Sequence, residues 1–202
     1  MEQGVSPVFQ IPMAQYENKD LISELKDFIL SKDSQGIESN VAPTIKQNLI
    51  ESKFNFFQND ADIVRRTAQW IASCLKKTIN TIQMEDIDYK FFFKESWYHI
   101  TKTNGMHEPH IHPTCSWCGI YYVQSGDDDK GGDTVFSNPV FPNHIDRGNL
   151  YLNNMSQIRV KAEDGKLIFF PSFLSHYQSL YEGTKDRIVV AFNINVNKRE
   201  EN

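Results

Sequence analysis

Apolar residues recur at helical spacing in two stretches of the first 86 residues. In the first stretch they fall three or four positions apart and predict a helix over about 19–31, built around Leu21, Ile22, Leu25, Phe28 and Ile29. In the second stretch one apolar stripe predicts a longer helix through Val64, Ala68, Ile71, Leu75 and Ile79. A short leading strand is expected over 8–12. Residues 33–58 show little periodicity and are expected to form a loop.

After residue 86 the pattern changes from helices to strands. Residues 89–101 are rich in aromatic and β-branched side chains, which favour strands. Turn-forming residues such as those at 125–129 and 164–165 separate further strand-like runs, which cover 106–112, 116–124, 133–137, 156–162, 166–170, 175–181 and 187–195. About eight short strands predict a sandwich or barrel, with the N-terminal helices over one outer face.

The chain has the organisation of a single unit. Its 202 residues contain no internal repeat, low-complexity tract or linker, so we expect one domain over residues 1–202. Within it, residues 1–86 are expected to form a helical support region and residues 87–197 the β core.

Composition and charge narrow the class of protein. A net charge of −5, with no block of five or more basic residues, argues against nucleic acid as the main partner. No apolar run approaches the roughly 20 residues of a membrane span, and the N-terminal residues lack a signal-peptide pattern. Three cysteines are too few for a disulfide framework. We therefore expect a cytoplasmic protein without a membrane partner, and the sequence does not indicate its oligomeric state.

Three histidines have the spacing that a metal site requires. His110 and His112 lie two residues apart, and alternate side chains of a strand point to one face, so both imidazoles can enter the same space. His176, at the expected start of a distant strand, can supply a third ligand. Non-haem iron oxygenases use three protein ligands, usually two histidines and a carboxylate. Here an imidazole would replace the carboxylate, unless Asp133 or Glu108 approaches the metal.

A basic residue follows these histidines in the last expected strand. Arg187 begins that strand and shares one face with Val189, Ala191 and Asn193. A guanidinium inside an apolar barrel is costly unless it meets an anion. Its planar fork is suited to a carboxylate held by two hydrogen bonds. The alternative for Arg187 is an internal ion pair.

Three other interpretations of these residues stay open. The first is a structural zinc site in which Cys115 and Cys118 join His110 and His112, although it leaves His176 without a role. A redox Cys-x-x-Cys pair is less favoured, because no βαβ pattern surrounds it. The second is a cupin, which also uses three histidines in a β-barrel. The third is a barrel that binds a partner without catalysis.

Taken together, these residues resemble the Fe(II)/2-oxoglutarate-dependent dioxygenases, in particular the 2OG-Fe(II) oxygenase branch. The resemblance covers about residues 90–195 and is carried by Ser96-Trp97, His110-Ile111-His112-Pro113, Gly119-Ile120-Tyr121-Tyr122-Val123, Phe169-Phe170-Pro171-Ser172, His176, and Arg187 with Phe192-Asn193. In addition, Gly131-Gly132-Asp133-Thr134-Val135-Phe136 resembles a Gly-Gly-acid-Thr-x-Phe segment of prolyl hydroxylases.

The resemblance implies a fold and a set of site residues. The fold is a double-stranded β-helix, a jelly-roll or cupin-like core of about eight strands, flanked by two helices. His110 and His176 match metal ligands, and His112 stands where most of the superfamily has Asp or Glu. Arg187 matches the residue that pairs with the far carboxylate of 2-oxoglutarate. Tyr122 matches a tyrosine that hydrogen-bonds the same carboxylate, or is otherwise a core residue.

The resemblance also implies the chemistry. The cofactors are Fe(II) and 2-oxoglutarate, with ascorbate as a supporting reductant, and O2 is the second cosubstrate. The product set is a hydroxylated substrate, succinate and CO2. The segment over 131–136 favours a prolyl or other amino-acid residue as the site of hydroxylation, in a small molecule or a peptide. A loop over 137–155 is expected to contact substrate.

The strand pattern also predicts which side chains surround the site. Trp97 and His99 share a face, where they can line the pocket but are expected to fill the core. Apolar walls that exclude water from a reactive site are expected from Ile120, Phe136, Phe169 and Val189.

Overall fold

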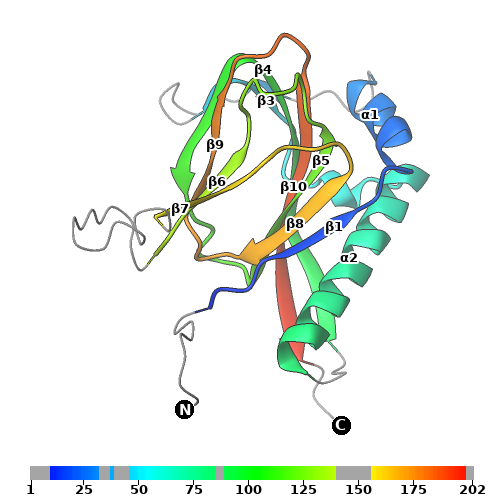
Figure 1. Cartoon of the computed structure of the whole chain (residues 1–202). Helices are drawn as coiled ribbons and strands as arrows, with labels where there is room; N and C mark the ends of the chain where they lie inside the picture. Colours follow the sequence, from blue (N-terminus) through cyan, green and yellow to red (C-terminus); the bar gives the residue numbers. More distant parts are fainter. Residues whose placement is uncertain (1–9, 32–36, 39–45, 85–88, 140–155, 199–202) are drawn as a thin grey trace, which may run out of the picture.

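The computed structural model describes residues 10–31, 37–38, 46–84, 89–139 and 156–198 (Figure 1). Two α-helices, α1 (Ile22–Leu30) and α2 (Asp62–Gln83), and a 3₁₀ turn at Phe56–Gln58 accompany the strands. The strands are β1 (Ala14–Glu17), β2 (Ile37–Glu38), β3 (Lys46–Glu51), β4 (Tyr89–His110), β5 (Trp117–Gln124), β6 (Thr134–Ser137), β7 (Gln157–Val160), β8 (Lys166–Pro171), β9 (His176–Tyr181) and β10 (Arg187–Lys198).

The strands form one antiparallel sheet that curls into two facing layers. Its order is β1-β8-β5-β10-β4-β9-β6-β7, with β3 on the other side of β4. The first half of β4 pairs with β10, and its last residues pair with β9. The strand bends between these halves, where Asn104 adopts a left-handed conformation beside Gly105. The structure therefore has the double-stranded β-helix that the sequence predicted.

Apolar side chains cluster on both sides of strands β5, β8 and β10. Helices α1 and α2 lie on the same outer side of the sheet (Figure 1), and their buried residues pack with alternate residues of β4, β5, β8 and β10. Among the residues described, neither helix is apolar and long enough to cross a membrane. The opposite side of these strands faces β6 and β9 and forms a second, smaller cluster around Phe136, Ile168 and Phe170. The inner cluster is where a site can form.

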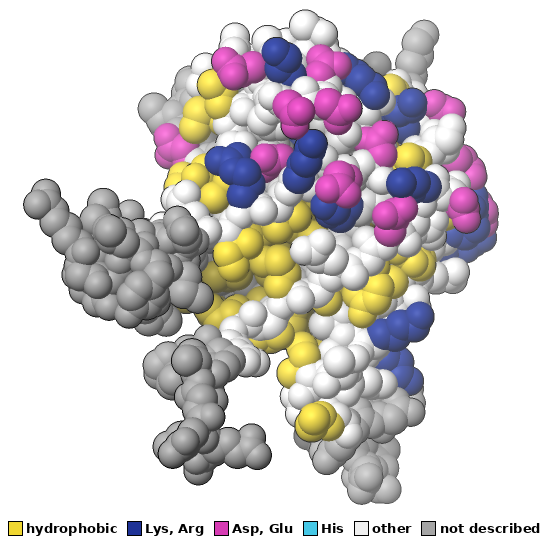
Figure 2. Space-filling view, in the orientation of Figure 1, with side chains coloured by type: hydrophobic (Ala, Val, Ile, Leu, Met, Phe, Trp, Pro, Cys, Tyr) yellow, Lys and Arg dark blue, Asp and Glu magenta, His cyan; other side chains and the backbone are white. Residues whose placement is uncertain are grey.

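The outer surface carries charges of both signs. On the face drawn in Figure 2, acidic and basic side chains are interspersed over the upper part, and apolar side chains gather below them. Several opposite charges pair, such as Lys161 with Asp129 and Lys102 with Asp186. Exposed pairs of this kind contribute little to stability, typically about 0–1 kcal/mol.

The N-terminal region contains strands that were not predicted. Residues 33–58, expected to be a loop, contain β2, β3 and the 3₁₀ turn. The strand β3 was missed because its sequence, Lys-Gln-Asn-Leu-Ile-Glu, is mostly polar, whereas pairing with β4 stabilises it. The region over 1–86 is thus not only helical, and its division from residues 87–197 stays a prediction.

The strands predicted over 89–101 and 106–112 form one strand, β4, which ends at His110. Other boundaries differ by a few residues. The first helix begins at Ile22 rather than near residue 19. The leading strand is Ala14–Glu17 rather than 8–12, of which residues 8–9 lie outside the described chain. Most of the loop predicted over 137–155 also lies outside it, since 140–155 are not described.

We expect the contact between α2 and the sheet to contribute strongly to stability. Ile71 is fully buried on α2. Replacing it by Ala removes three buried carbons and leaves a cavity, so the free energy of unfolding should fall by about 2–5 kcal/mol. Urea denaturation followed by circular dichroism measures this difference. Ile82→Ala, on the exposed side of the same helix, is the control and should change it by less than about 1 kcal/mol; equal effects would contradict the packing described here.

Candidate metal centre

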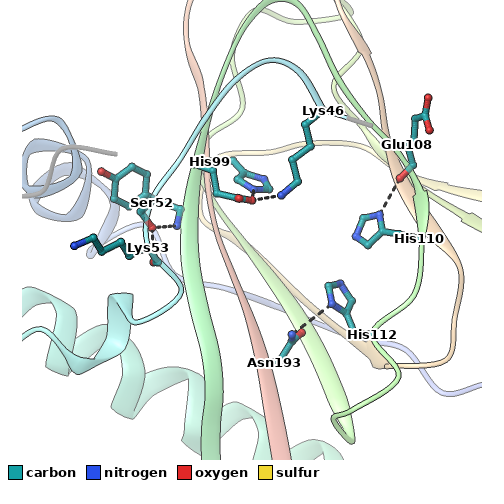
Figure 3. Close-up of polar contacts among 10 residues, drawn as sticks. Lys46, Ser52, Lys53, His99, Glu108, His110, His112 and Asn193 are labelled. Carbon is teal, nitrogen blue, oxygen red and sulfur yellow. Dashed lines mark hydrogen bonds and ion pairs between the residues drawn. The ribbon is translucent and has the colours of Figure 1, made fainter. Parts of the chain in front are cut away.

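Three histidines from separate parts of the chain meet between the two layers. His110 ends β4 and pairs in register with His176, which begins β9. His112 follows two residues after β4 (Figure 3). One ligand nitrogen from each imidazole lies within 4.8 Å of the other two. The structure thus brings together the three histidines that the sequence singled out.

Backbone carbonyls fix the proton on two of these imidazoles. The Nδ1 of His110 lies 2.8 Å from the carbonyl oxygen of Glu108, and the Nδ1 of His176 lies 3.0 Å from that of Leu174. A carbonyl oxygen only accepts, so each Nδ1 donates and each Nε2 keeps a lone pair. Contacts of this type orient metal-binding imidazoles and raise their basicity. Glu108 uses its carbonyl here, and its carboxylate points away from the ring (Figure 3).

His112 has a side-chain partner instead. Its Nδ1 lies 3.4 Å from the Nδ2 of Asn193, which also donates to Glu95 at 2.8 Å. The Oδ1 of the same amide accepts from the thiol of Cys118 at 3.3 Å. Strand alternation predicted that Asn193 faces the site, but its contact with His112 could not be inferred from the sequence. The amide therefore links His112 to two further side chains.

The three imidazoles are neutral at physiological pH. Burial is the main cause, and the positive charge of neighbouring imidazoles adds to it. These effects lower the pKa of His112 to about 4 and that of His176 to about 3. Burial also lowers the pKa of His110. A metal ligand must offer a lone pair, so the neutral ring is the form that binds a metal ion, and His110 and His176 already present theirs at Nε2.

A fourth histidine stacks on this cluster. The ring centroids of His107 and His110 are 4.1 Å apart, and that of His99 lies 5.8 Å from His107. Burial, followed by the charge of His110, lowers the pKa of His107, so this ring is also neutral. Sequence analysis missed His107 because the β4–β9 register shifts on both sides of it, which breaks the alternation of faces.

His99 contacts a buried ion pair formed by Glu51 and Lys46. The Nε2 of His99 lies 2.6 Å from the carboxylate of Glu51, which also pairs with the ammonium of Lys46 (Figure 3). Burial opposes ionisation of Glu51, but bonds to His99 and Lys46 outweigh it and lower its pKa. Burial lowers the pKa of His99. The neutral His99 ring therefore donates from Nε2 to Glu51 and presents Nδ1 as an acceptor.

A guanidinium lies at the other end of the same cavity. Arg187 is buried, donates from Nη1 to Gln178 at 2.8 Å, and sits 5.4 Å from the Tyr122 ring centroid. Burial lowers its pKa, but an arginine stays protonated in proteins. Its Nε has no hydrogen-bond partner, and no described carboxylate forms an ion pair with it. The internal ion pair considered as an alternative for Arg187 is not found among the described residues.

The glycine pair next to this arginine is required by close packing. Gly131 and Gly132 both have positive φ, at +80° and +77°. A Cβ on Gly132 would lie 2.8 Å from the Cδ and 3.1 Å from the Nε of Arg187. A Cβ on Gly131 would lie 2.0 Å from the carbonyl oxygen of Leu180. The backbone here approaches the guanidinium as only glycine allows.

Tyr122 lies beside the arginine and packs in the inner cluster. Its hydroxyl is 2.6 Å from that of Thr134 and is fully buried. Thr134, Gln178 and Arg187 line the cavity, and Tyr122 does not. Burial raises the pKa of Tyr122, so its hydroxyl keeps its proton. Thr134 therefore supplies a second hydroxyl beside Arg187, and the proposed contact of Tyr122 with 2-oxoglutarate stays a prediction.

The apolar walls agree with the prediction except at one position. Ile120 and Val189 line the cavity, and Phe136 packs in the inner cluster against His176. Phe169 was expected there, but it packs on the outer side with the helices, and Phe170 lines the cavity instead. Trp97 and His99, expected to fill the core, are both buried and both line the cavity.

The alternative ligands are not at the histidine cluster. Among the described residues, the three histidines form the one group of three or more side chains spaced for a metal, and no cysteine or carboxylate joins it. Asp133 accepts instead from the backbone of Ala162 and from Arg159. Cys118 is buried at the cavity and Cys115 is partly exposed. The geometry therefore does not favour the zinc site with Cys115 and Cys118.

Solved structures share this fold. A prolyl-4-hydroxylase from Pseudomonas putida has a TM-score of 0.63 at 13% identity, covering 92% of this chain and 93% of that one. A collagen prolyl hydroxylase from Paramecium Bursaria Chlorella virus-1 has 0.58 at 13%, covering 90% and 94%. The α-ketoglutarate-dependent epimerase SnoN of nogalamycin biosynthesis has 0.65 at 8%, covering 94% and 79%. At such low identity, the structural similarity establishes the fold and not the substrate.

A protein-family comparison is more specific. No curated protein matches the chain. Residues 95–193, which include the three histidines and Arg187, match the family described as "Putative 2OG-Fe(II) oxygenase". Neutral imidazole donors and a buried unpaired guanidinium fit a ferrous ion and 2-oxoglutarate, the cofactors that this family implies. The chain belongs to the 2OG-Fe(II) oxygenase family and is an enzyme of that family.

Proposed function

We propose that this enzyme hydroxylates an unactivated C–H bond of a prolyl or other amino-acid residue. In this proposal His110, His112 and His176 bind Fe(II), and Arg187 binds the far carboxylate of 2-oxoglutarate. With both bound, the metal centre supplies the oxidation in which O2 and 2-oxoglutarate yield a hydroxylated substrate, succinate and CO2.

One observation carries the assignment of the cosubstrate. Arg187 is a buried cation whose Nε has no partner, at the end of a cavity whose other polar wall is the histidine cluster. A buried charge without a counter-ion is costly, so an anion is expected to bind there. A diacid could place one carboxylate at Arg187 and reach the metal with its other end. Gln178 and Thr134 add polar groups beside the guanidinium.

Residues of the chain hold the metal ligands in place before any ion binds. The carbonyl oxygens of Glu108 and Leu174 orient His110 and His176, and Asn193 contacts His112. Replacing the usual carboxylate by His112 removes one negative charge from the ligand set. The neutral set then leaves a bound ferrous ion more electrophilic. Ile120, Val189 and Phe170 keep water away from the centre.

Three observations support an amino-acid residue as substrate. The Gly131-Gly132-Asp133-Thr134-Val135-Phe136 segment resembles prolyl hydroxylases, and its glycines pack directly against Arg187 and Leu180. Two structurally similar proteins are described as prolyl hydroxylases. In addition, the apolar side chains of Ile111 and Phe173 are exposed near the histidine cluster, where they could contact a peptide.

Removing one proposed ligand should abolish metal-dependent binding of 2-oxoglutarate. We expect His176→Ala to lose the metal-to-ligand charge-transfer absorption that appears when Fe(II) and 2-oxoglutarate are added without oxygen. The measurement is an anaerobic absorption titration, with circular dichroism to show that the variant is folded. His107→Ala is the control, because His107 is not in the ligand group and the absorption should persist. An unchanged absorption in folded His176→Ala would refute the ligand assignment.

Removing the guanidinium should weaken the binding of 2-oxoglutarate and leave the binding of Fe(II) nearly unchanged. Truncating one side of a buried charge pair costs about 2–5 kcal/mol, so Arg187→Ala should raise the Kd for 2-oxoglutarate by about 100-fold. The Kd for Fe(II) alone should change by less than about threefold. Both are measured by anaerobic titration. Arg159→Ala, which removes an exposed guanidinium, should leave both constants unchanged. If Arg187→Ala weakens iron and 2-oxoglutarate equally, the proposed role is wrong.

A further inference from the structure

Two cysteines lie in contact beside the histidine cluster. Cys115 and Cys118 are three residues apart, and their sulfurs are separated by 3.6 Å. Both are free thiols. A disulfide requires about 2.05 Å between sulfurs, so bond formation needs an approach of about 1.5 Å. Side-chain rotation with a small loop shift can supply such a movement, because Cys115 precedes β5 and is not held in a ladder.

Each thiol also contacts a group that holds His112. The thiol of Cys115 points to the backbone carbonyl oxygen of His112, with sulfur and oxygen 3.6 Å apart. The thiol of Cys118 donates to the Oδ1 of Asn193, whose Nδ2 lies 3.4 Å from the Nδ1 of His112. Oxidation of the pair removes both S–H donors at once. The cysteines are therefore connected to one proposed metal ligand through its backbone and through its side chain.

The two thiols differ in exposure, which favours Cys115 as the one that an oxidant reaches first. Cys115 is partly exposed, whereas Cys118 is buried. Reactive cysteines are usually partly exposed and near a cation; Lys94, whose ammonium binds the carbonyl of Thr114, provides that cation.

We propose that Cys115 and Cys118 form a modification site that hydrogen peroxide oxidises to a disulfide, and that this disulfide weakens metal binding at His112. The thiolate of Cys115 attacks one peroxide oxygen, the O–O bond breaks, and a sulfenic acid and hydroxide form. The thiol of Cys118 then attacks the sulfenic sulfur, and its proton leaves with the hydroxyl group as water. The hydroxide takes a proton from solvent. In total, two thiols and one peroxide give one disulfide and two waters.

The effect on metal binding follows from the lost contacts. Without the thiol donor of Cys118, the described contacts of the Asn193 amide are those with Glu95 and His112, and the approach of Cys115 draws the residues that follow His112 toward β5. Loss of partners that orient metal ligands typically lowers metal affinity by about 10–100-fold. We therefore expect the oxidised protein to bind Fe(II) about tenfold more weakly than the reduced protein. This second part rests on the proposed role of the histidines.

The test begins with metal-free protein, so that iron does not react with peroxide. The protein is treated with hydrogen peroxide, freed of the excess, alkylated and digested. Mass spectrometry should show a fragment that carries the Cys115–Cys118 disulfide, two hydrogen masses lighter, with Cys74 alkylated. Alkylation of both Cys115 and Cys118 after treatment would overturn the modification site, whatever the protein's reaction is. Anaerobic Fe(II) titration of the treated and untreated protein then measures the change in affinity.

Matched variants separate the disulfide from other oxidation. Cys115→Ser cannot form the bond, and its Fe(II) affinity should not respond to peroxide. Cys74→Ser removes a buried cysteine of α2 and should respond as the unaltered protein does. Dithiothreitol should restore the affinity of the oxidised protein. If the disulfide forms but the Fe(II) affinity is unchanged, the coupling to His112 is refuted; if neither form binds Fe(II), the histidine site itself fails while the modification site is still tested by mass spectrometry.

Discussion

The site depends on one strand that belongs to both layers of the sheet. The first half of β4 pairs with β10 and places Thr101 opposite Arg187, and its last residue pairs with His176 on β9. The guanidinium and the histidine pair are therefore positioned by the middle and the C-terminal end of a single strand. The bend occurs at Asn104 and Gly105, where a Cβ on the glycine would lie 2.3 Å from Thr101. The distance between the two binding elements is thus set by backbone hydrogen bonds and not by flexible loops.

Burial keeps the imidazoles around the cavity uncharged. The imidazoles are neutral because water is excluded, and they offer lone pairs to a cation. The positive charge of Lys46 is balanced by the carboxylate of Glu51, whereas Arg187 has no carboxylate partner within the described chain. The cavity is thus prepared for a cation at one end and an anion at the other. This asymmetry, more than any single contact, favours a metal together with a diacid.

Local patterns in the sequence were sufficient for much of the site. The alternation of Arg187, Val189, Ala191 and Asn193 follows from strand geometry alone, and all four residues line the cavity. The His-x-His spacing also indicated the cluster, although β4 ends at His110 and His112 lies two residues beyond it. Glu51 and Lys46 could not be found in this way. Glu51 is 48 residues from His99 in sequence, and it lies on a strand whose polar composition resembles that of a loop. Only the pairing of β3 with β4 brings it to the site.

The error at Phe169 shows why register matters more than composition. Residues 166–170 were correctly predicted as a strand, but either Phe169 or Phe170 could face inward. In the antiparallel pair of β5 and β8, Cys118 is opposite Phe170 and Gly119 is opposite Phe169. Paired residues share a face, so Phe170 must lie with Cys118 inside, and Phe169 must lie outside. Gly119 also fits this arrangement, because a Cβ there would lie 2.3 Å from the Phe192 ring. Once one residue of β5 is known to face inward, the register therefore fixes the face of every residue on the paired strand β8.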